Sequence, residues 1–260
     1  MVALLMAVDI QFIKSELNRL EMLIDRFIKE SNVQSLQSDI QFIRVEQERQ
    51  GKLIDDIFKN SFPICTTAKS SGMYSMFLPK FSQPLKVVCD AETQGGGWTI
   101  ILRRLDGTVD FYRNWTQYQH GFGDLNGEFF MGLDNINALT TERAYELLVI
   151  LEDFEGKETF ERYEEFAIGN ADQQYILHTL GKANGTAGDA LSYHYKKKFS
   201  TFDRDNDAGP GNCAVIHPGA WCQLTGRYKD DTSFSGINWL TFHEDSYSLK
   251  KAIMMIRPRR

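Results

Sequence analysis

The stretch Gly95–Leu102, with the sequence GGGWTIIL, joins a glycine run directly to a short run of apolar residues. Glycine suits sharp changes of backbone direction, whereas tryptophan, threonine and isoleucine favour strands. A second apolar run, LKVVC at residues 85–89, precedes it. Because Gly and Asp/Asn clusters bound both runs, the pattern predicts strands of an antiparallel or mixed sheet.

Helices and large loops are expected around this sheet. Thr141-Glu142-Arg143 has the polar character of a helix start and predicts a helix over residues 144–151. Stretches rich in Gly, Asn and Asp at 181–192 and 203–212 predict long loops. Together these signals place the region in the α+β class.

Composition divides the chain of 260 residues into two regions. All four Trp, ten Tyr, four Cys and six Pro lie after residue 60, together with nineteen of the twenty Gly. Pro63 ends the first region because it removes a backbone donor and disfavours helix in its predecessor. We therefore predict a helical segment at 1–60 and a globular domain at 61–260.

The first sixty residues carry a heptad pattern. Apolar residues recur in alternating steps of three and four, with charged residues between them, at Ala3, Met6, Ile10, Ile13, Leu17, Leu20, Ile24 and Phe27. Such a narrow apolar seam predicts a coiled coil, and self-association through residues 9–59, better than it predicts a helix packed on its own domain.

An internal repeat interrupts this seam. The sequence DIQFI at residues 9–13 recurs at 39–43, and LID at 23–25 recurs at 53–55, a period of thirty residues. Thirty is not a multiple of seven, so one seam cannot continue through both copies. The break is expected at Ser31-Asn32, as either a local rewinding of the supercoil or a turn into a helical hairpin.

Several separate motifs after residue 64 resemble one family, the fibrinogen C-terminal domain. They occur in the family's order over about residues 64–260: GGGWT at 95–99, RLDGTVDF at 104–111, GFGD at 121–124, EFFMGLD at 128–134, FSTFDRD at 199–205 and GINW at 236–239. The family includes fibrinogen chains, ficolins, tachylectins and angiopoietins. In these proteins the domain commonly follows a coiled-coil or collagen stalk.

Four cysteines in the second region fit two disulfides in an oxidising compartment. In the family the first cysteine pairs with the second and the third with the fourth, which here implies Cys65–Cys89 and Cys213–Cys222. Two glycosylation sequons begin at Asn114 and Asn184, and Asn184 is the favoured acceptor because it lies in a Gly-rich loop.

The loop DRDNDAGPGNC at residues 203–213 is the strongest chemical signal. Alternating carboxylates in a Gly/Pro loop offer the hard oxygen ligands that Ca²⁺ requires, whereas a solvated acidic turn is the alternative. Resemblance to the family's calcium site implies side-chain ligands from Asp205 and Asp207 and backbone carbonyls from Gly209 and Gly211. Asp203 is expected to support the loop.

The family's ligand pocket lies beside this loop, and in its lectin members it accepts acetyl groups using aromatic residues and a His that follows the fourth cysteine. This chain has Gln223 at that place, and only eight residues separate Cys213 from Cys222. Tyr228, Trp221 and His217 are the candidate pocket residues. Trp221 is also compatible with a place in the core, and His217 with an ordinary loop position.

No catalytic arrangement is evident in the sequence, so we expect a binding protein and not an enzyme. The resemblance implies a secreted, oligomeric, lectin-like protein that binds glycans or acetylated groups with calcium in innate immunity. The alternative is an extracellular ligand of the angiopoietin type that acts on a cell-surface receptor or adhesion partner.

The expected environment is extracellular, although residues 2–8 are too short and uncharged to identify a signal peptide. A net charge of −6 argues against nucleic acid as a partner. No run of apolar residues is long enough to predict a membrane span.

Overall fold

The computed structural model describes residues 2–31, 34–61, 64–78, 80–207, 209, 211–216, 220, 224–232 and 235–259. The chain forms two compact units, Met1–Phe62 and Pro63–Arg260. Among the described residues, no helix combines the length and apolarity needed to cross a membrane.

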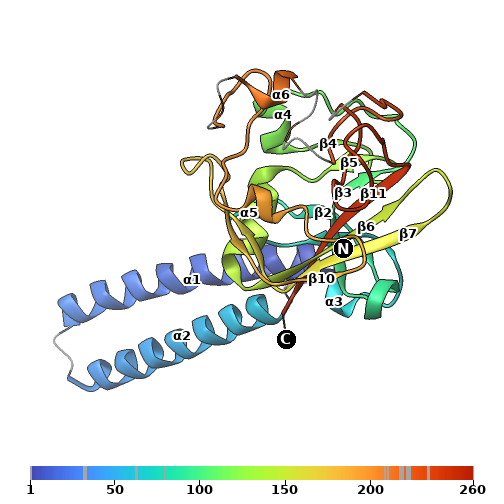
Figure 1. The fold of residues 1–260 in the computed structure, drawn as a ribbon. Coiled ribbons are helices and arrows are strands. Elements are labelled where there is room, and N and C mark those ends of the chain that lie inside the picture. The colour runs from blue at the N-terminus through green and yellow to red at the C-terminus, as the bar shows by residue number, and fades with distance from the viewer. Residues whose placement is uncertain are drawn as a thin grey trace. The chain divides into compact units, whose positions relative to one another are not determined.

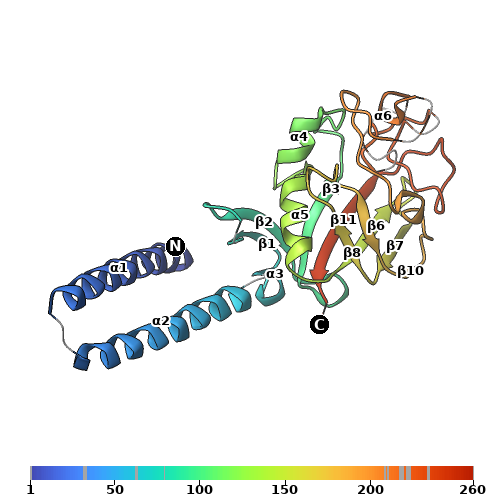
Figure 2. The same cartoon turned by 90° about the vertical axis from the view of Figure 1, so that its left-hand side faces the viewer.

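The first unit is a helical hairpin made of α1 (Val2–Ser31) and α2 (Gln34–Ser61), which run antiparallel (Figures 1 and 2). The Arg44 guanidinium of α2 lies 3.4 Å from the Glu21 carboxylate and 3.6 Å from that of Asp25, both on α1. The thirty-residue repeat is therefore arranged as a hairpin and not as one rewound helix. The junction at residues 32–33 lies outside the described residues.

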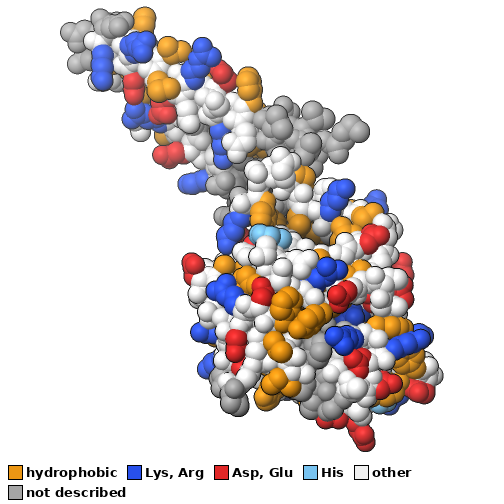
Figure 3. Space-filling model, turned by 90° about the horizontal axis from the view of Figure 1, so that it is seen from above, with side chains coloured by type: hydrophobic (Ala, Val, Ile, Leu, Met, Phe, Trp, Pro, Cys, Tyr) orange, Lys and Arg blue, Asp and Glu red, His pale blue; other side chains and the backbone are white. Residues whose placement is uncertain are grey.

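The described apolar side chains of the α1 heptad seam fall into two sets that differ in burial. Ile10, Leu17 and Ile24, which are seven residues apart, are partly buried. The other set, Ile13, Leu20 and Phe27, leaves 46%, 52% and 61% of its surface exposed. Hydrophobic side chains are accordingly visible on the outside of the helices (Figure 3).

The second unit is built on a sheet that has nine strands among the described residues, all paired antiparallel. The main path runs through β1 (Gly72–Met76), β2 (Leu85–Asp90), β3 (Trp98–Arg104), β11 (Lys251–Pro258), β6 (Tyr145–Glu152), β7 (Glu158–Tyr163) and β10 (Ala183–Gly185). β5 (Phe129–Phe130) pairs with β3, and β4 (Phe122–Gly123) pairs with β5. β8 (Phe166–Ile168) and β9 (Leu177–Leu180) form a separate pair.

Helices and turns accompany the sheet, which confirms the α+β class. The longest helix of this unit is α5 (Leu133–Glu142), and the others are the short segments α3 (Ile64–Thr67), η1 (Thr93–Gly95), α4 (Trp115–His120), η2 (Ser192–His194) and α6 (Cys213–Ile216). α5 lies against one face of the sheet, across β3 and β11 (Figure 2). Its Leu133 and Ile136 face Ile101 and Met254 across a small internal cavity of about 30 Å³.

The two predicted strands at residues 85–89 and 98–102 are present as β2 and β3, which pair with each other. The helix predicted over residues 144–151 is wrong, because Tyr145–Glu152 is strand β6. Seven of its eight residues are buried, and a continuous apolar run of this length fits a buried strand as well as a helix. Thr141 and Glu142 end helix α5 instead of beginning another helix.

A disulfide fastens the start of the globular unit to its sheet. Cys65 of α3 and Cys89 of β2 are joined with a Cα–Cα distance of 5.1 Å, as the family resemblance implied. The bond closes a loop with a sequence separation of 24. Such a loop restricts the unfolded chain, which is the main way a disulfide stabilises a fold.

Removing this bond with the double substitution Cys65→Ala and Cys89→Ala is expected to lower the free energy of unfolding by about 3 kcal/mol, from the loop length. Urea unfolding under oxidising conditions measures the change. In excess reductant the two proteins should unfold alike, because both then lack the bond. A difference that persists in reductant would contradict this explanation.

Candidate functional site

Side chains bind the backbone in the segment between Phe199 and Cys213. This segment contains the loop at residues 203–213, called the aspartate loop below. The Asn206 side-chain amide donates to the Phe199 carbonyl at 2.8 Å, and the Asn206 backbone N–H donates to Ser200 Oγ at 3.0 Å. The Asn212 side-chain amide donates to the Thr201 carbonyl at 2.9 Å. These hydrogen bonds replace the regular backbone pairing of a sheet, so the loop is held by its own side chains.

Asp203 supports the loop from one end. Its Oδ1 accepts a hydrogen bond of 2.9 Å from the Trp115 backbone N–H, in the first turn of α4, and one of 2.8 Å from Thr201 Oγ1. The Arg204 guanidinium lies 4.1 Å from the centre of the Trp115 ring. Asp203 is engaged by these donors, which fits the supporting role expected from the sequence.

Asp205 and Asp207 lie on the outer part of the loop. Asp205 Oδ1 accepts from the Asp207 backbone N–H at 3.1 Å. Asp207 Oδ1 accepts from the Gly209 N–H and its Oδ2 from the Cys213 N–H, both at 2.8 Å. The Asp207 carboxylate therefore bridges the two sides of the loop.

The oxygen atoms of this loop are of the kind that can bind calcium. A Cβ built on Gly209 would lie 3.1 Å from Asp207 Oδ1 and 3.5 Å from the Gly211 carbonyl oxygen, so these two oxygens flank the same point. Two carboxylates and backbone carbonyls are hard oxygen ligands of the kind that Ca²⁺ prefers. In the described part of the chain, no three His, Cys, Asp or Glu side chains form a metal-binding group, so a calcium ion here would depend on backbone carbonyls and water.

A cavity of about 670 Å³ opens beside the loop. Asp207, Gly209 and Gly211, three of the four predicted calcium residues, contribute to one part of its wall. The remaining lining residues are Tyr193, His194, Lys196, Lys197, Lys198, Ser200, Asn206, Cys213, Ala214 and Ile216. Its size is that of a small-molecule or saccharide pocket.

His194 is buried at this cavity. Burial, with a smaller contribution from the charge of Lys197, lowers the pKa of His194 to about 4. Its imidazole is therefore neutral at physiological pH. A neutral imidazole at the wall of a pocket can make a hydrogen bond without adding charge to the site.

Sequence reasoning missed the residues on the other side of this cavity, from Tyr193 to Lys198. The run Lys196-Lys197-Lys198 is visible in the sequence just before the aspartate loop, but no local pattern shows that its side chains share a cavity with Asp207. The chain folds back after this run, because the Asn206 side-chain amide donates to the Phe199 carbonyl and the Asn206 backbone N–H donates to Ser200 Oγ. The lysine run itself is held to β9, where the Leu177 N–H donates to the Lys197 carbonyl at 3.0 Å and the Lys196 N–H donates to the Leu177 carbonyl at 2.8 Å.

Tyr228, a predicted pocket residue, lines a different cavity of about 480 Å³. Arg104, Arg227 and the segment 107–112 form the rest of its wall. The Tyr228 ring packs on Gly107, where a Cβ would lie 2.7 Å from that of Tyr228. The structure thus does not bring Tyr228 to the cavity beside the aspartate loop.

The other predicted residues around the second disulfide are only partly described. Cys213 is disulfide-bonded. His217, Trp221 and Cys222 lie outside the described residues. Their roles, and the Cys213–Cys222 pairing, stay predictions.

The two sequons differ in their surroundings. Asn114 is the N-cap of α4, and its side chain accepts a hydrogen bond of 2.9 Å from the Gln117 backbone N–H. Asn184 lies exposed on β10. An acceptor asparagine must be accessible, so Asn184 stays the favoured site.

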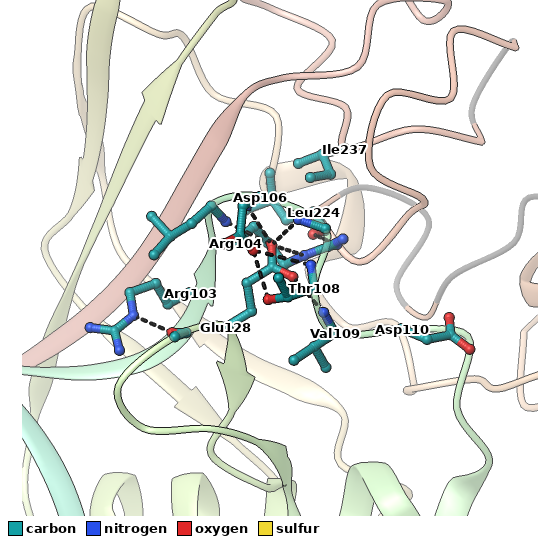
Figure 4. Close-up of polar contacts among 12 residues, drawn as sticks. Arg103, Arg104, Asp106, Thr108, Val109, Asp110, Glu128, Leu224 and Ile237 are labelled. Atoms are coloured by element: carbon teal, nitrogen blue, oxygen red, sulfur yellow. Dashed lines mark hydrogen bonds and ion pairs between the residues drawn. The ribbon is translucent and has the colours of Figure 1, made fainter.

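A buried ion pair, Arg104 with Glu128, organises the wall of the second cavity (Figure 4). The Arg104 Nε lies 3.6 Å from Glu128 Oε1, and both side chains are almost completely buried. Glu128 accepts hydrogen bonds from the backbone N–H groups of Leu105, Asp106, Gly107 and Val109, at 2.7 to 3.2 Å.

Arg104 extends this network to a distant part of the chain. It donates to the carbonyls of Leu224 and Gly226 at 3.0 and 2.7 Å, and its guanidinium lies 3.8 Å from the centre of the Phe111 ring. Burial lowers the pKa of Arg104 to about 10, partly offset by Glu128, so the guanidinium stays charged at neutral pH. Burial acts to raise the pKa of Glu128, but the backbone hydrogen bonds and Arg104 outweigh it and hold the pKa below its ordinary value.

The family described as "Fibrinogen beta and gamma chains, C-terminal globular domain" matches residues 63–259. The chain belongs to the fibrinogen C-terminal domain family. The resemblance inferred from the motifs is therefore confirmed.

Curated relatives place this fibrinogen C-terminal domain beside two groups of larger proteins. It is 42% identical to chicken (Gallus gallus) tenascin over 197 residues, which is 73% of this chain and 11% of tenascin. It is 40% identical to mouse (Mus musculus) angiopoietin-related protein 2 over 206 residues, 73% of this chain and 41% of the relative. The chain thus spans less than half of the length of these relatives.

Solved structures agree with the fold of the fibrinogen C-terminal domain. The fibrinogen-like globe domain of human ANGPTL2 is 39% identical, with a TM-score of 0.70 that covers 74% of this chain and 94% of that one. Lamprey fibrin D-dimer is 28% identical, with a TM-score of 0.66 over 96% of this chain and 94% of that one. The lamprey protein was solved in complex with the peptide Gly-His-Arg-Pro-amide.

The substitution Glu128→Gln is expected to lower the free energy of unfolding by about 3–5 kcal/mol, because it leaves Arg104 buried without its counter-charge. Glu92→Gln is the matched control, since the Glu92 side chain is exposed and makes no capping hydrogen bond to η1. Urea unfolding of both variants at neutral pH measures the effect. A Glu128→Gln variant as stable as the control would contradict it.

The Glu128 carboxylate should also make the free energy of unfolding depend on pH in the acid range. Since the pKa of Glu128 is lower in the folded state, its contribution is complete above the ordinary Glu value of about 4.3 and is lost as pH falls through the folded value. The unfolding free energy of the native protein should therefore fall below about pH 4, and more steeply than that of Glu128→Gln. If the unfolding free energies of the native protein and of Glu128→Gln fall equally steeply below about pH 4, Glu128 is not the cause.

Proposed function

We propose that this chain is an extracellular, oligomeric recognition protein whose globular domain binds a glycan or acetylated group beside the loop Asp203–Cys213. One observation carries the proposal: three of the four predicted calcium residues line the cavity of about 670 Å³. The tenascin and angiopoietin-related relatives are secreted proteins, which supports an extracellular location. The role requires binding only and no catalysis.

Calcium is part of this proposal. Asp205 and Asp207 would supply carboxylate oxygens, and Gly209 and Gly211 would supply backbone carbonyls. A bound Ca²⁺ would screen the two neighbouring carboxylates from each other and hold the loop in one conformation. A fixed loop loses less conformational freedom when a ligand binds, which favours affinity.

A second candidate is a protein ligand of the angiopoietin type. The 40% identity to angiopoietin-related protein 2 favours it, as do the exposed apolar side chains of Val215 and Ile216, in α6 next to the cavity. Exposed apolar side chains at the rim of a cavity suit a protein partner better than a sugar. In this case the same face would contact a receptor or adhesion partner.

Self-association would arise from the helical hairpin. The exposed set Ile13, Leu20 and Phe27 forms a row at seven-residue spacing, which is the geometry of a helix seam. We infer that this row packs against a second copy of the hairpin. Several domains in one particle would then raise weak single-site binding to useful avidity, as innate immune recognition of surface glycans requires.

Calcium-dependent retention of the full chain on N-acetylated resin tests the leading proposal. We expect retention in Ca²⁺, release by EDTA, and loss in Asp205→Ala, because that substitution removes a ligand while the two hydrogen bonds accepted by the Asp207 carboxylate stay. Asp231→Ala is the control, since Asp231 is an exposed aspartate outside the loop. Isothermal titration with Ca²⁺ should show the same difference between the variants.

The competing outcome is equally specific. If the chain ignores acetylated resin and EDTA but binds cell-surface protein, the angiopoietin-type alternative replaces the lectin-like one. If Asp205→Ala binds Ca²⁺ as the native chain does, the assignment of the loop fails.

Sedimentation of the full chain tests the hairpin. The double substitution Ile13→Lys and Leu20→Lys places charges in the exposed row and is expected to convert the oligomer to a monomer with unchanged helical circular dichroism. Met22→Lys is the matched control, because Met22 is exposed but lies outside the seam. A native chain that sediments as a monomer would disprove self-association.

A further inference from the structure

The cavity beside the aspartate loop carries an excess of positive charge in an acidic protein. Lys196, Lys197 and Lys198 are exposed and line it together, whereas Asp207 is the one acidic residue of its described lining. Both oxygens of Asp207 already accept backbone hydrogen bonds, from Gly209 and Cys213. The negative charge of the loop is thus partly compensated, while the lysine side faces the solvent-filled cavity.

Lys196 occupies this place at a conformational cost. Its backbone φ is +62°, in the left-handed region that favours glycine. The turn is fixed on both sides, because the Lys196 N–H donates to the Leu177 carbonyl at 2.8 Å and the Lys197 N–H to the His194 carbonyl at 2.9 Å. A strained residue at a pocket points to a role for its side chain, because glycine would build the same turn without strain.

The rest of the wall provides the other groups of a saccharide site. Tyr193 leaves 76% of its surface exposed at the cavity, and Ser200 contributes a hydroxyl. Lysine ammonium groups attract carboxylate or sulfate, and an aromatic ring can cover the apolar face of a sugar. We propose that this pocket binds a glycan that carries carboxylate or sulfate groups.

This inference rests on the proposed recognition function and specifies the class of its ligand. The observations favour a glycan over larger anions. A nucleic acid or an anionic membrane would need an extended basic surface, but positive and negative side chains are interspersed on the visible face of the globular unit (Figure 3). The three lysines are instead consecutive and share one cavity, which suits a few charged groups on a short ligand.

Titration calorimetry of the full chain with a heparin-derived tetrasaccharide and a hyaluronan tetrasaccharide tests the proposal. The first probe carries sulfate and carboxylate and the second carboxylate alone, so the two arms distinguish the anionic group. We expect binding of at least one probe, weaker in about 0.3 M than in about 0.05 M NaCl because salt screens the lysines. Lys197→Gln with Lys198→Gln should weaken it about tenfold.

Lys196→Gly separates a binding role from a structural one. It removes the ammonium group and relieves the left-handed strain, so the variant should bind the probe more weakly yet unfold at the same or a higher urea concentration. Lys229→Gly is the matched control. Lys229 also has a positive φ, of 56°, but it is not part of the described lining, and its ammonium lies 5.4 Å from the Phe154 ring. This control should keep the native affinity for the probe.

Three outcomes would overturn the proposal: no binding of either tetrasaccharide, native affinity in all the lysine variants of the pocket, or equal binding of polyglutamate or phosphatidylserine vesicles. The acetylated-resin assay distinguishes this failure from that of the proposed function. If the resin retains the chain in calcium but neither tetrasaccharide binds, the proposed recognition function stands and only the preference for anionic glycans fails. Lysine-dependent tetrasaccharide binding without resin retention supports the anionic ligand and removes the acetyl-group assignment.

Discussion

The globular unit depends on a carboxylate placed inside its core. A charged group taken out of water must be compensated by hydrogen bonds and opposite charge, and Glu128 receives both, from the turn after β3 and from Arg104. Because Arg104 also binds carbonyls more than a hundred residues later in the chain, one ion pair holds three separate segments together. The positive φ of Gly107 follows from the same constraint, since the turn must curl around Glu128 while the Tyr228 ring packs against it.

The loop segment after Phe199 is held by side-chain hydrogen bonds and not by a buried ion pair. The described residues between Phe199 and Asn212 have little regular structure, and their path depends on Asn and Asp side chains that bind the backbone. Asp203 connects this loop to the first turn of α4, and so to the aromatic cluster around Trp115 and Phe199. Such loops are held on a rigid scaffold without being part of it, which is the usual arrangement of binding residues. The cavity beside the aspartate loop therefore combines an ordered base with the exposed side chains of Tyr193 and the three lysines.

The sequence predicted the parts of this molecule whose signals are local. The strands around Leu85–Cys89 and Trp98–Leu102 and the family followed from local motifs, and the Cys65–Cys89 bond followed from the resemblance to that family. The helix over residues 144–151 failed because a strand buried on both faces lacks the alternation that distinguishes strands from helices. The cavity was out of reach for another reason, because its lining side chains come together through the hydrogen bonds of Asn206 to Phe199 and Ser200, which no local sequence pattern indicates.

Net charge is a poor guide to what such a site binds. Charges separated by more than about 8 Å are largely screened at physiological salt, so the −6 of the whole chain has little influence inside one cavity. What matters there is the local set of three lysines, one aspartate engaged by backbone donors, and a histidine that burial keeps neutral. Since the pKa of His194 is about 4, it adds no charge between about pH 5 and 8, and the charged groups of the described lining are then the lysines and Asp207. An anion held in this cavity would therefore respond to salt far more than to pH.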